Sequence, residues 1–475
     1  MEKFQLIALY AVPALVCFDN SNDAYIPEQW ANESLMILEE SMVMANLVHR
    51  DFESQVQNFG DVVNTRRPSK FASQRRGDFD AVLAQDANST NVAVVLDQHH
   101  YNTFVIRDGE GSKSFADLAN IYLRPAVQAV GRGVDRSVAG QAHRFFGTPA
   151  GRVGALGAST SSNVRSNIVE CREKLNLLNV PQDEFRNMVV APGVESDMLN
   201  TDLFVRANES GSADALRRAS IGNLFGFNIY AANNVPAVSL AQCDVVTGTI
   251  TNAIAAGAAP ASQACVISAY DVQVGEYFTI AGNAQPQIAT AKTFSTNTTA
   301  ITPNESNKFA TSAGAVVTVY RHFAAKGAQV AGQSKAILVD GYTLPPTAGR
   351  MVSIGTGAAK RDYTIIEAYA GPASDWFILL DRPLEANLAD NGLIFPAPAG
   401  EYNMAFHKNA LALITRPLAR PNTSTGVLST VASNGVSSMR ICMQYDSSLM
   451  GTRCTVDMLS GVALLDPNMG VLFLG

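Results

Sequence analysis

The stretch PAVQAVGRGVDRSVAGQAHRFF, residues 125–146, predicts the longest helix of this chain. Pro125 suits the first helical position, where its missing N–H costs nothing. Apolar side chains recur at helical spacing along one face: Val127, Val130, Val134, Val138 and Phe145. Polar side chains occupy much of the rest: Arg132, Asp135, Arg136, Gln141 and Arg144. Gly147 and Pro149 form a stop signal, so the helix would be about 33 Å long.

Three glycines interrupt this helix, at Gly131, Gly133 and Gly140. Each weakens a helix by about 1 kcal/mol relative to alanine. Such a helix must be stabilised by packing against neighbouring elements, or its glycines serve to let another segment approach the helix backbone closely. A long core helix of an ordinary α/β domain is the simplest alternative.

Composition restricts the class of protein. The chain has 475 residues, of which 47% are hydrophobic and only 16% charged, below the usual quarter for a soluble domain. This balance favours extensive buried surface, within one subunit or between subunits. The formal net charge of −7 argues against a protein whose main task is to bind phosphates. Six scattered cysteines without a C-x-x-C pair fit free thiols better than disulfides or a zinc site.

Residues 6–18 form the one apolar run that could direct export. Glu2 precedes Lys3, Pro13 interrupts the run, and Cys17 is not followed by a small-residue cleavage site. The run is also too short to span a bilayer. We therefore expect an apolar arm that packs on a neighbouring subunit of a soluble protein, with a signal peptide as the alternative.

A long hairpin is expected to follow the arm. Strand patterns occur around residues 62–67, 92–96 and 103–106, whereas residues 69–91 are polar with few apolar anchors. Loops of this length are uncommon in compact domains unless they are functional. Five basic residues lie in this region: Arg66, Arg67, Lys70, Arg75 and Arg76. Acidic residues interleave with them and no aromatic pattern accompanies them, so contacts with a neighbouring subunit are favoured over nucleic acid.

The remainder divides by composition. Residues 162–178 predict a second helix, and residues 187–192 predict a short buried strand. Residues 237–400 are rich in Ala, Thr, Gly and Val and contain many short strand patterns. Regular short strands separated by turns indicate a β-barrel or sandwich, which we interpret as a domain inserted into the main fold. Earlier patterns return after Glu401, where residues 404–415 predict one strand.

No set of residues predicts catalysis. Asp97, His99 and His100 could be metal ligands, but neighbouring residues of a strand face opposite ways and two ligands are too few. The glycines of residues 151–157 lack the pattern and the preceding strand of a dinucleotide site. Asp381 and Glu385, beside Arg382, are expected to be solvated hairpin charges. We expect neither an enzyme nor a cofactor or metal.

Five stretches together resemble one known family. They are Tyr25-Ile-Pro-Glu-Gln-Trp30, Asn187-Met-Val-Val-Ala-Pro192, Gly226-Phe-Asn-Ile-Tyr230 through Pro236, Met404–Leu413 through Pro417, and Asp457-Met-Leu-Ser-Gly-Val462. Their order and spacing, with a β-rich interruption after Pro236, resemble the major capsid (coat) protein of tailed bacteriophages. The resemblance is to the Hong Kong-type phage capsid fold, in the branch that carries an inserted domain.

The resemblance implies an α+β fold with six segments. They are an N-terminal arm (1–50), an extended loop or β-hairpin (51–112), a peripheral domain with a spine helix (113–186), the first part of an axial domain (187–237), an inserted all-β, barrel-like domain (238–400), and a return to the axial and peripheral domains (401–475). The basic residues of the extended loop would make inter-subunit contacts. Gly131 and Gly133 would form a hinge in the spine helix. Lys70 lies where some relatives form a covalent crosslink, although no partner for it is evident.

The implied function is self-assembly, through pentamers and hexamers, into an icosahedral head that encloses double-stranded DNA. The expected partners are other copies of the chain, portal and scaffolding proteins, decoration proteins as an option, and packaged DNA through weak non-specific contact, with no membrane. The location would be the virion, after assembly in the cytoplasm of the host bacterium. The alternative is an exported β-rich surface or adhesion protein.

Overall fold

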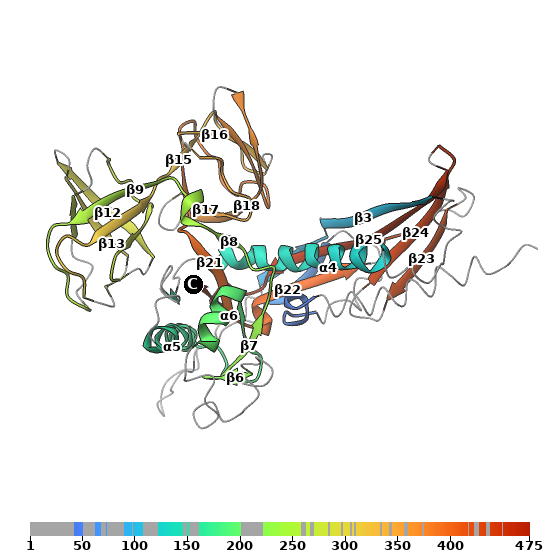
Figure 1. Cartoon of the computed structure of the whole chain (residues 1–475), viewed down its shortest axis with the longest axis horizontal. Helices are drawn as coiled ribbons and strands as arrows, with labels where there is room; N and C mark the ends of the chain where they lie inside the picture. Colours follow the sequence, from blue (N-terminus) through green and yellow to red (C-terminus); the bar gives the residue numbers. More distant parts are fainter. Residues whose placement is uncertain are drawn as a thin grey trace, which may run out of the picture.

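The computed structural model describes residues 42–50, 62–67, 73, 90–107, 122–145, 150–151, 161–200 and 222–475. Short gaps fall at 97, 258–262, 267–269, 284–285, 296–297, 305, 308–309, 333–334, 342–343, 356–359, 373–374, 417, 422–426, 434–437 and 449. The predicted apolar arm and the stretch Tyr25–Trp30 lie outside the described residues. The described chain forms an elongated arm on one side and a cluster of sheets and barrels on the other (Figure 1).

The predicted long helix lies along the elongated arm. It is α4, Arg124–Ala139, and it continues as the 3-10 helix η5, Gly140–Phe145, so it tightens at Gly140 where a single α-helix had been predicted. Its predicted apolar stripe is confirmed, because all five side chains are at most 4% exposed. The stripe packs on a five-stranded sheet (Figure 1). The strands are β3 (Gln98–Arg107), β22 (Leu411–Arg416), β23 (Leu428–Ser433), β24 (Ser438–Asp446) and β25 (Gly451–Leu464).

A second, mixed sheet forms the centre of the molecule, in the order β4-β26-β21-β5-β7-β6, with β8 paired to β21. Its strands are β4 (Ala150–Gly151), β5 (Arg186–Val190), β6 (Asn223–Leu224), β7 (Phe227–Ala231), β8 (Ala237–Val238), β21 (Gly400–His407) and β26 (Gly470–Leu474). Helices α5 (Ser161–Leu177) and α6 (Pro192–Leu199) accompany this sheet. The predicted single strand over residues 404–415 is wrong, because the 3-10 helix η9 (Lys408–Ala410) separates β21 from β22.

Residues 245–396 form two consecutive closed antiparallel barrels of six described strands each. Barrel 1 contains β9 (Val245–Ile250), β10 (Gln263–Val266), β11 (Tyr277–Ile280), β12 (Gln287–Ser295), β13 (Thr298–Pro303) and β14 (Val316–Tyr320). Barrel 2 contains β15 (Phe323–Ala325), β16 (Ala336–Asp340), β17 (Met351–Ile354), β18 (Arg361–Ala370), β19 (Trp376–Leu380) and β20 (Leu393–Pro396). Closure removes exposed strand edges, and each barrel has its own apolar core.

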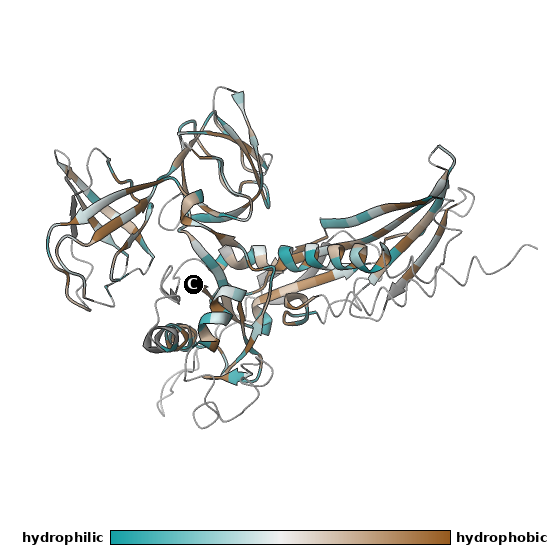
Figure 2. Ribbon diagram, viewed as in Figure 1, coloured by the Kyte–Doolittle hydropathy of each residue, from teal (hydrophilic) through white to brown (hydrophobic). Residues whose placement is uncertain are grey.

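Hydropathy follows the packing of these elements. Figure 2 shows that hydrophobic and hydrophilic residues alternate along α4, and its hydrophobic residues Val127, Val130 and Val134 are buried in the core that α4 shares with the sheet. The largest apolar cluster runs from α4 through β21 and β22 to residues at the junction of the two barrels, including Tyr277, Tyr320 and Phe395. The barrels are therefore packed against the main body and are not separate units on a flexible tether.

Candidate functional site

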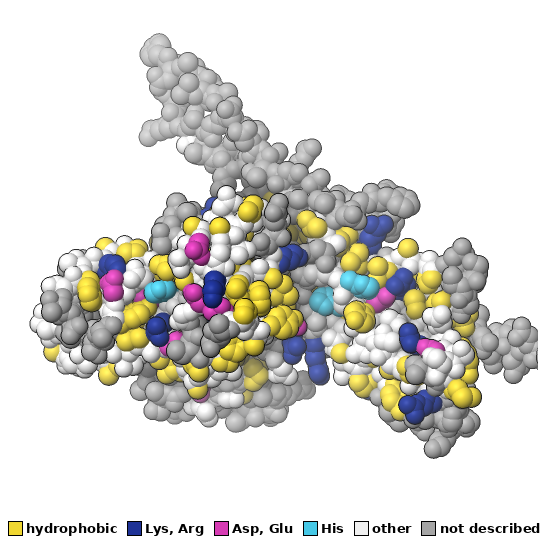
Figure 3. All heavy atoms as spheres, turned by 90° about the horizontal axis from the view of Figure 1, so that it is seen from above, with side chains coloured by type: hydrophobic (Ala, Val, Ile, Leu, Met, Phe, Trp, Pro, Cys, Tyr) yellow, Lys and Arg dark blue, Asp and Glu magenta, His cyan; other side chains and the backbone are white. Residues whose placement is uncertain are grey.

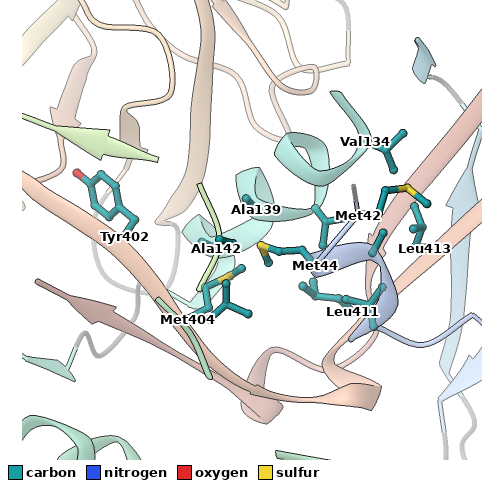
Figure 4. Close-up of a cluster of buried hydrophobic side chains, with 14 of the residues drawn as sticks. Met42, Met44, Val134, Ala139, Ala142, Tyr402, Met404, Leu411 and Leu413 are labelled. Atoms are coloured by element: carbon teal, nitrogen blue, oxygen red, sulfur yellow. The ribbon is translucent and has the colours of Figure 1, made fainter. Parts of the chain in front are cut away.

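Residues 42–50 dock into the main core, and we refer to them as the foot. They contain the 3-10 helix η2 (Met44–Asn46). Figure 4 shows Met42 and Met44 of this foot beside Leu411 and Leu413, with α4 close by. Both methionines are at most 1% exposed. The foot also pairs with β22, where His49 N–H donates to Leu411 O at 3.0 Å.

Asp135 of α4 holds this foot in place. Its carboxylate accepts backbone N–H groups from Val43 (3.0 Å), Met44 (3.4 Å) and Ala45 (3.1 Å), which are the free donors at the start of η2. Burial raises the pKa of Asp135, while these N–H groups and Asn234 act in the opposite direction. Sequence reasoning placed Asp135 on the polar side of the helix, and that was wrong: the residue is 0% exposed. Periodicity gave no signal, because its partners are about 90 residues away in sequence.

The base of the predicted hairpin is a two-stranded antiparallel sheet of β1 (Val62–Arg67) and β2 (Thr90–Val95). Its register places Arg67 opposite Thr90 and Arg66 opposite Asn91, so both arginines lie at the outer end of the ladder. Val94 and Leu96 anchor the base, because they pack in a cluster with residues of β22 and β25. Lys70, Arg75 and Arg76 lie outside the described residues.

The proposed hinge glycines lie in the middle of α4. Gly131 is buried, and Gly133 faces β3. A Cβ added at Gly133 would lie 2.9 Å from Nδ1 of His100, whose Nε2 is 3.3 Å from Ser137 Oγ. Close approach between α4 and β3 is thus one reason for glycine at 133. Burial, and then the neighbouring His99, lower the pKa of His100.

The histidines of β3 have structural partners. As predicted from strand geometry, His99 and His100 point to opposite faces: His100 faces α4, and His99 Nε2 lies 3.5 Å from Asp457 on the other face. The buried Asp457 carboxylate pairs with Arg440 across the β24–β25 ladder, at 2.9 and 2.5 Å. No cluster of three or more His, Cys, Asp or Glu side chains suited to a metal occurs among the described residues.

Barrel 2 contacts the end of α4. Thr364 Oγ1 of β18 donates to Gly140 O at 3.0 Å, where the α-helix changes to η5. Arg382 pairs with Asp381 (3.0 Å) and Glu385 (2.9 Å), and its guanidinium lies 4.4 Å from the centre of the Tyr363 ring. The expectation of solvated hairpin charges was wrong for Asp381, whose side chain is 16% exposed, whereas that of Glu385 is 44% exposed. Arg382 is 18% exposed because it lies against the Tyr363 ring, and its pairing with Asp381 removes that carboxylate from water.

An exposed apolar row crosses the outer wall of barrel 2. Leu338, Phe377 and Tyr369 are directly opposite one another on β16, β19 and β18. Phe377 and Tyr369 are 40% and 54% exposed, and Ile366 at the nearby bulge is 49% exposed. Figure 3 looks onto the top of the molecule, where hydrophobic side chains gather over this barrel. Such rows are typical of contact surfaces.

Two further properties concern the described chain as a whole. Four cysteines whose side chains the structure describes, Cys171, Cys243, Cys442 and Cys454, are free thiols, and burial raises the pKa of Cys454 to about 12. Within the described ranges, no helix combines the length and the apolar character needed to cross a membrane.

Comparison with known proteins gave similarity to solved structures only. No family model matches the chain, and no curated protein sequence matches it. The chain is similar to a structure from Mycobacterium phage Che8, at 15% identity and a TM-score of 0.43, over 91% of this chain and 90% of that chain. It is also similar to the capsid structure of cyanophage P-SCSP1u, at 10% identity, a TM-score of 0.40 and coverage of 88% and 84%. A third is the mature capsid of bacteriophage PhiM1, at 10% identity, a TM-score of 0.37 and coverage of 88% and 83%.

Proposed function

We propose that this chain is the major capsid protein of a tailed double-stranded DNA bacteriophage and assembles into the icosahedral head. One observation carries the proposal. The described stretches of the family resemblance lie on β5, β7, β21–β22 and β25, which are far apart in sequence. In the fold, β5 pairs with β7 and β21, and β22 pairs with β25. The resemblance thus falls on paired strands of two sheets, which η9 links between β21 and β22, and the structures similar to this chain include phage capsids.

The segments implied by the resemblance have a physical rationale. Residues 113–186 would be the peripheral domain, in which α4 is the spine helix on the long sheet. Residues 187–237 and 401–475 would supply the axial domain and the return. Residues 238–400 would be the insertion, here a pair of barrels, because its two ends are adjacent: Val238 is opposite Gly400 in the β8–β21 ladder. A unit whose ends meet can be added to a fold without displacing its framework.

The two limbs support assembly with identical copies. Residues 1–41 precede a foot that is buried in the subunit core, and residues 68–89 connect the two strands of a hairpin base that Val94 and Leu96 anchor. Shells are built from repeated symmetric contacts, to which such limbs contribute by reaching neighbours. The basic residues Arg66, Arg67, Lys70, Arg75 and Arg76 would contact acidic surface on the next copy in pentamers and hexamers.

The proposed partners follow from the same function. Portal and scaffolding proteins would complete assembly in the host cytoplasm, and the protein would act as a structural, non-enzymatic component of the virion. The formal net charge of −7 favours weak, salt-dependent contact with packaged DNA, because like charges repel.

Assembly of the purified chain tests the function directly. The full chain, expressed alone and with candidate scaffolding proteins, is examined by electron microscopy and analytical ultracentrifugation. Closed shells of megadalton mass are expected. A compact monomer that persists at high concentration under both conditions contradicts the proposal.

A further inference from the structure

Only two residues, Arg321 and His322, connect the barrels, because β14 ends at Tyr320 and β15 begins at Phe323. Arg321 is tied to barrel 1: its N–H donates to Asp244 O at 3.0 Å, and its guanidinium lies 3.3 Å from the Asp244 carboxylate. Phe323 is 1% exposed in the core of barrel 2. The backbone between these two anchors therefore decides how the barrels are oriented.

Glu276 of barrel 1 fixes the second connecting residue. Its carboxylate is 0% exposed and accepts His322 N–H at 3.0 Å, His322 Nδ1–H at 2.6 Å and Gln273 N–H at 2.8 Å. The hydroxyl of Tyr270 donates to the same carboxylate. Burial, and then the charge of Glu276, raise the pKa of Tyr270, so its phenol stays protonated as a donor. Buried carboxylates persist only when their oxygens are satisfied in this way.

The adjacent residue, Tyr277, makes a second contact between the barrels. Its hydroxyl lies 2.8 Å from Ser353 Oγ on β17, and Ser353 in turn donates to Asp362 at 2.5 Å. Lys360 of barrel 2 lies over the Tyr277 ring, 5.2 Å from its centre. Both side chains bridged by this contact are buried, which strengthens a hydrogen bond between them.

The backbone of barrel 1 also approaches barrel 2 closely. Gly275 has a φ of +108°, a conformation available to glycine, and a Cβ at this position would lie 2.7 Å from the Phe395 ring of β20. The same ring packs edge-on against His322, with 6.4 Å between ring centres. Three consecutive residues, Gly275, Glu276 and Tyr277, thus form one side of the joint.

We infer that the two barrels are one rigid body, and that Glu276 is the positioning residue that sets their relative orientation. Tyr277 supplies the second fixed point, and Thr364 connects barrel 2 to Gly140 at the end of α4. A displacement of either barrel is therefore transmitted to α4. The inference rests on these contacts and does not depend on the proposed function.

Distance measurements in the full chain test the inference. Spin labels are attached through noncanonical amino acids at the exposed Ser295 of barrel 1 and Ala336 of barrel 2, which leaves the native cysteines unlabelled. Labelled chain is diluted into unlabelled chain so that distances between copies do not contribute. The native chain should give one narrow distribution. Glu276→Gln should widen it at least twofold, because one acceptor oxygen becomes an NH2 group that faces N–H donors.

A milder variant and a control keep the result interpretable. Tyr277→Phe removes a single oxygen and should widen the distribution less, whereas Tyr277→Phe with Glu276→Gln should widen it most. Tyr363→Phe is the matched control, because the Tyr363 hydroxyl accepts Glu385 N–H within barrel 2. Amide exchange at Gln273 and His322 should quicken in Glu276→Gln while the strands of both barrels stay protected. A broad native distribution, or an unchanged width in the double variant, overturns the inference.

Discussion

Asp135 shows how one side chain decides the position of a whole segment. Asp135→Ala leaves three backbone N–H groups of residues 43–45 without their acceptor, at about 1–3 kcal/mol for each unsatisfied group. We expect the urea midpoint of the subunit to fall and residues 42–50 to become sensitive to protease. Asp135→Asn keeps one acceptor oxygen and should lose less. Arg132→Ala, on the exposed side of α4, is the control; equal midpoints for Asp135→Ala and the control contradict this role.

The contact between Asp183 and His407 predicts that the stability of the subunit depends on pH. His407 Nε2–H faces the Asp183 carboxylate, 3.1 Å from each oxygen, because Nδ1 accepts Asn409 N–H. Burial alone would raise the pKa of Asp183, but hydrogen bonds from His407 and Phe185 N–H outweigh it and lower the pKa. Because folding lowers the pKa of this carboxylate, the contact stabilises the folded chain at pH values above 3.8, the pKa of the carboxylate in the unfolded chain. This stabilisation is lost as the pH falls through the lower pKa of the folded chain.

The measurement is the thermal midpoint of the native chain and Asp183→Asn across pH. The native chain should be the more stable above about pH 4, and the difference should shrink below it. A difference that stays constant from pH 7 to pH 3 would show that the pair does not contribute in this way.

Prediction from sequence succeeded where the signal was local. The apolar stripe Val127–Val138 could be predicted because helix periodicity depends only on residues three and four positions apart, and the stripe is buried as predicted. Asp135 and Glu276 were missed, because each carboxylate is satisfied by donors that the fold brings together, and no pattern marks such a residue. The predicted inter-subunit contacts of the residues beyond the hairpin base, including Lys70, stay predictions.

At the scale of the element, Gly133 of α4 allows close packing of the helix against His100 of β3. Gly133→Ala should gain about 1 kcal/mol of helix propensity, but the new Cβ must displace His100. We therefore expect the gain to appear in full only in the His100→Ala background, as a coupling of about 0.5 kcal/mol or more in a double-mutant cycle of urea unfolding. No coupling would mean that β3 gives way without cost.

The same pair of variants separates packing from a hinge. If Gly133 serves only close packing, the double variant His100→Ala with Gly133→Ala should form precursor shells that expand normally into mature shells. A hinge at Gly131 and Gly133 predicts instead that the subunits are stable and assemble, but that their precursor shells fail to expand. Electron microscopy of the shells measures the expansion. Gly131→Ala tests the other hinge position by itself.

The hairpin is an element whose proposed role lies outside its own subunit. Reversing Arg75 and Arg76 to Glu should abolish shells while leaving the urea midpoint unchanged, because the hairpin base is held by Val94 and Leu96. Electron microscopy and unfolding of the same preparation give both readouts. Lys335→Glu, an exposed charge on barrel 2, is the control for added negative charge. Shells of normal size and yield from the reversed hairpin contradict its assembly role.

At the scale of the molecule, the contacts form one continuous mechanical path. Barrel 1 is fixed to barrel 2 at Glu276 and Tyr277, and barrel 2 contacts the end of α4 at Gly140. Asp135 of α4 in turn binds the foot, residues 42–50. Short strands in residues 237–400 predicted β structure, but the sequence did not reveal two barrels. Closure depends on which distant strands pair, such as β9 with β14 and β15 with β20.

Removing the barrel pair tests whether this path matters for assembly. Because Val238 is opposite Gly400, residues 239–399 can be replaced by a two-residue Gly-Gly turn that continues the β8–β21 ladder. The framework of β5, β21 and β25 should still form, but Tyr277, Tyr320 and Phe395 leave the main core cluster, and Gly140 loses its contact with Thr364. We expect a folded but less stable subunit that builds shells of irregular size, because the end of α4 is no longer braced. Electron microscopy of the deletion beside the native chain measures this, and circular dichroism verifies folding. Regular shells of native diameter would mean that the barrels serve another purpose, on the outer surface of the particle.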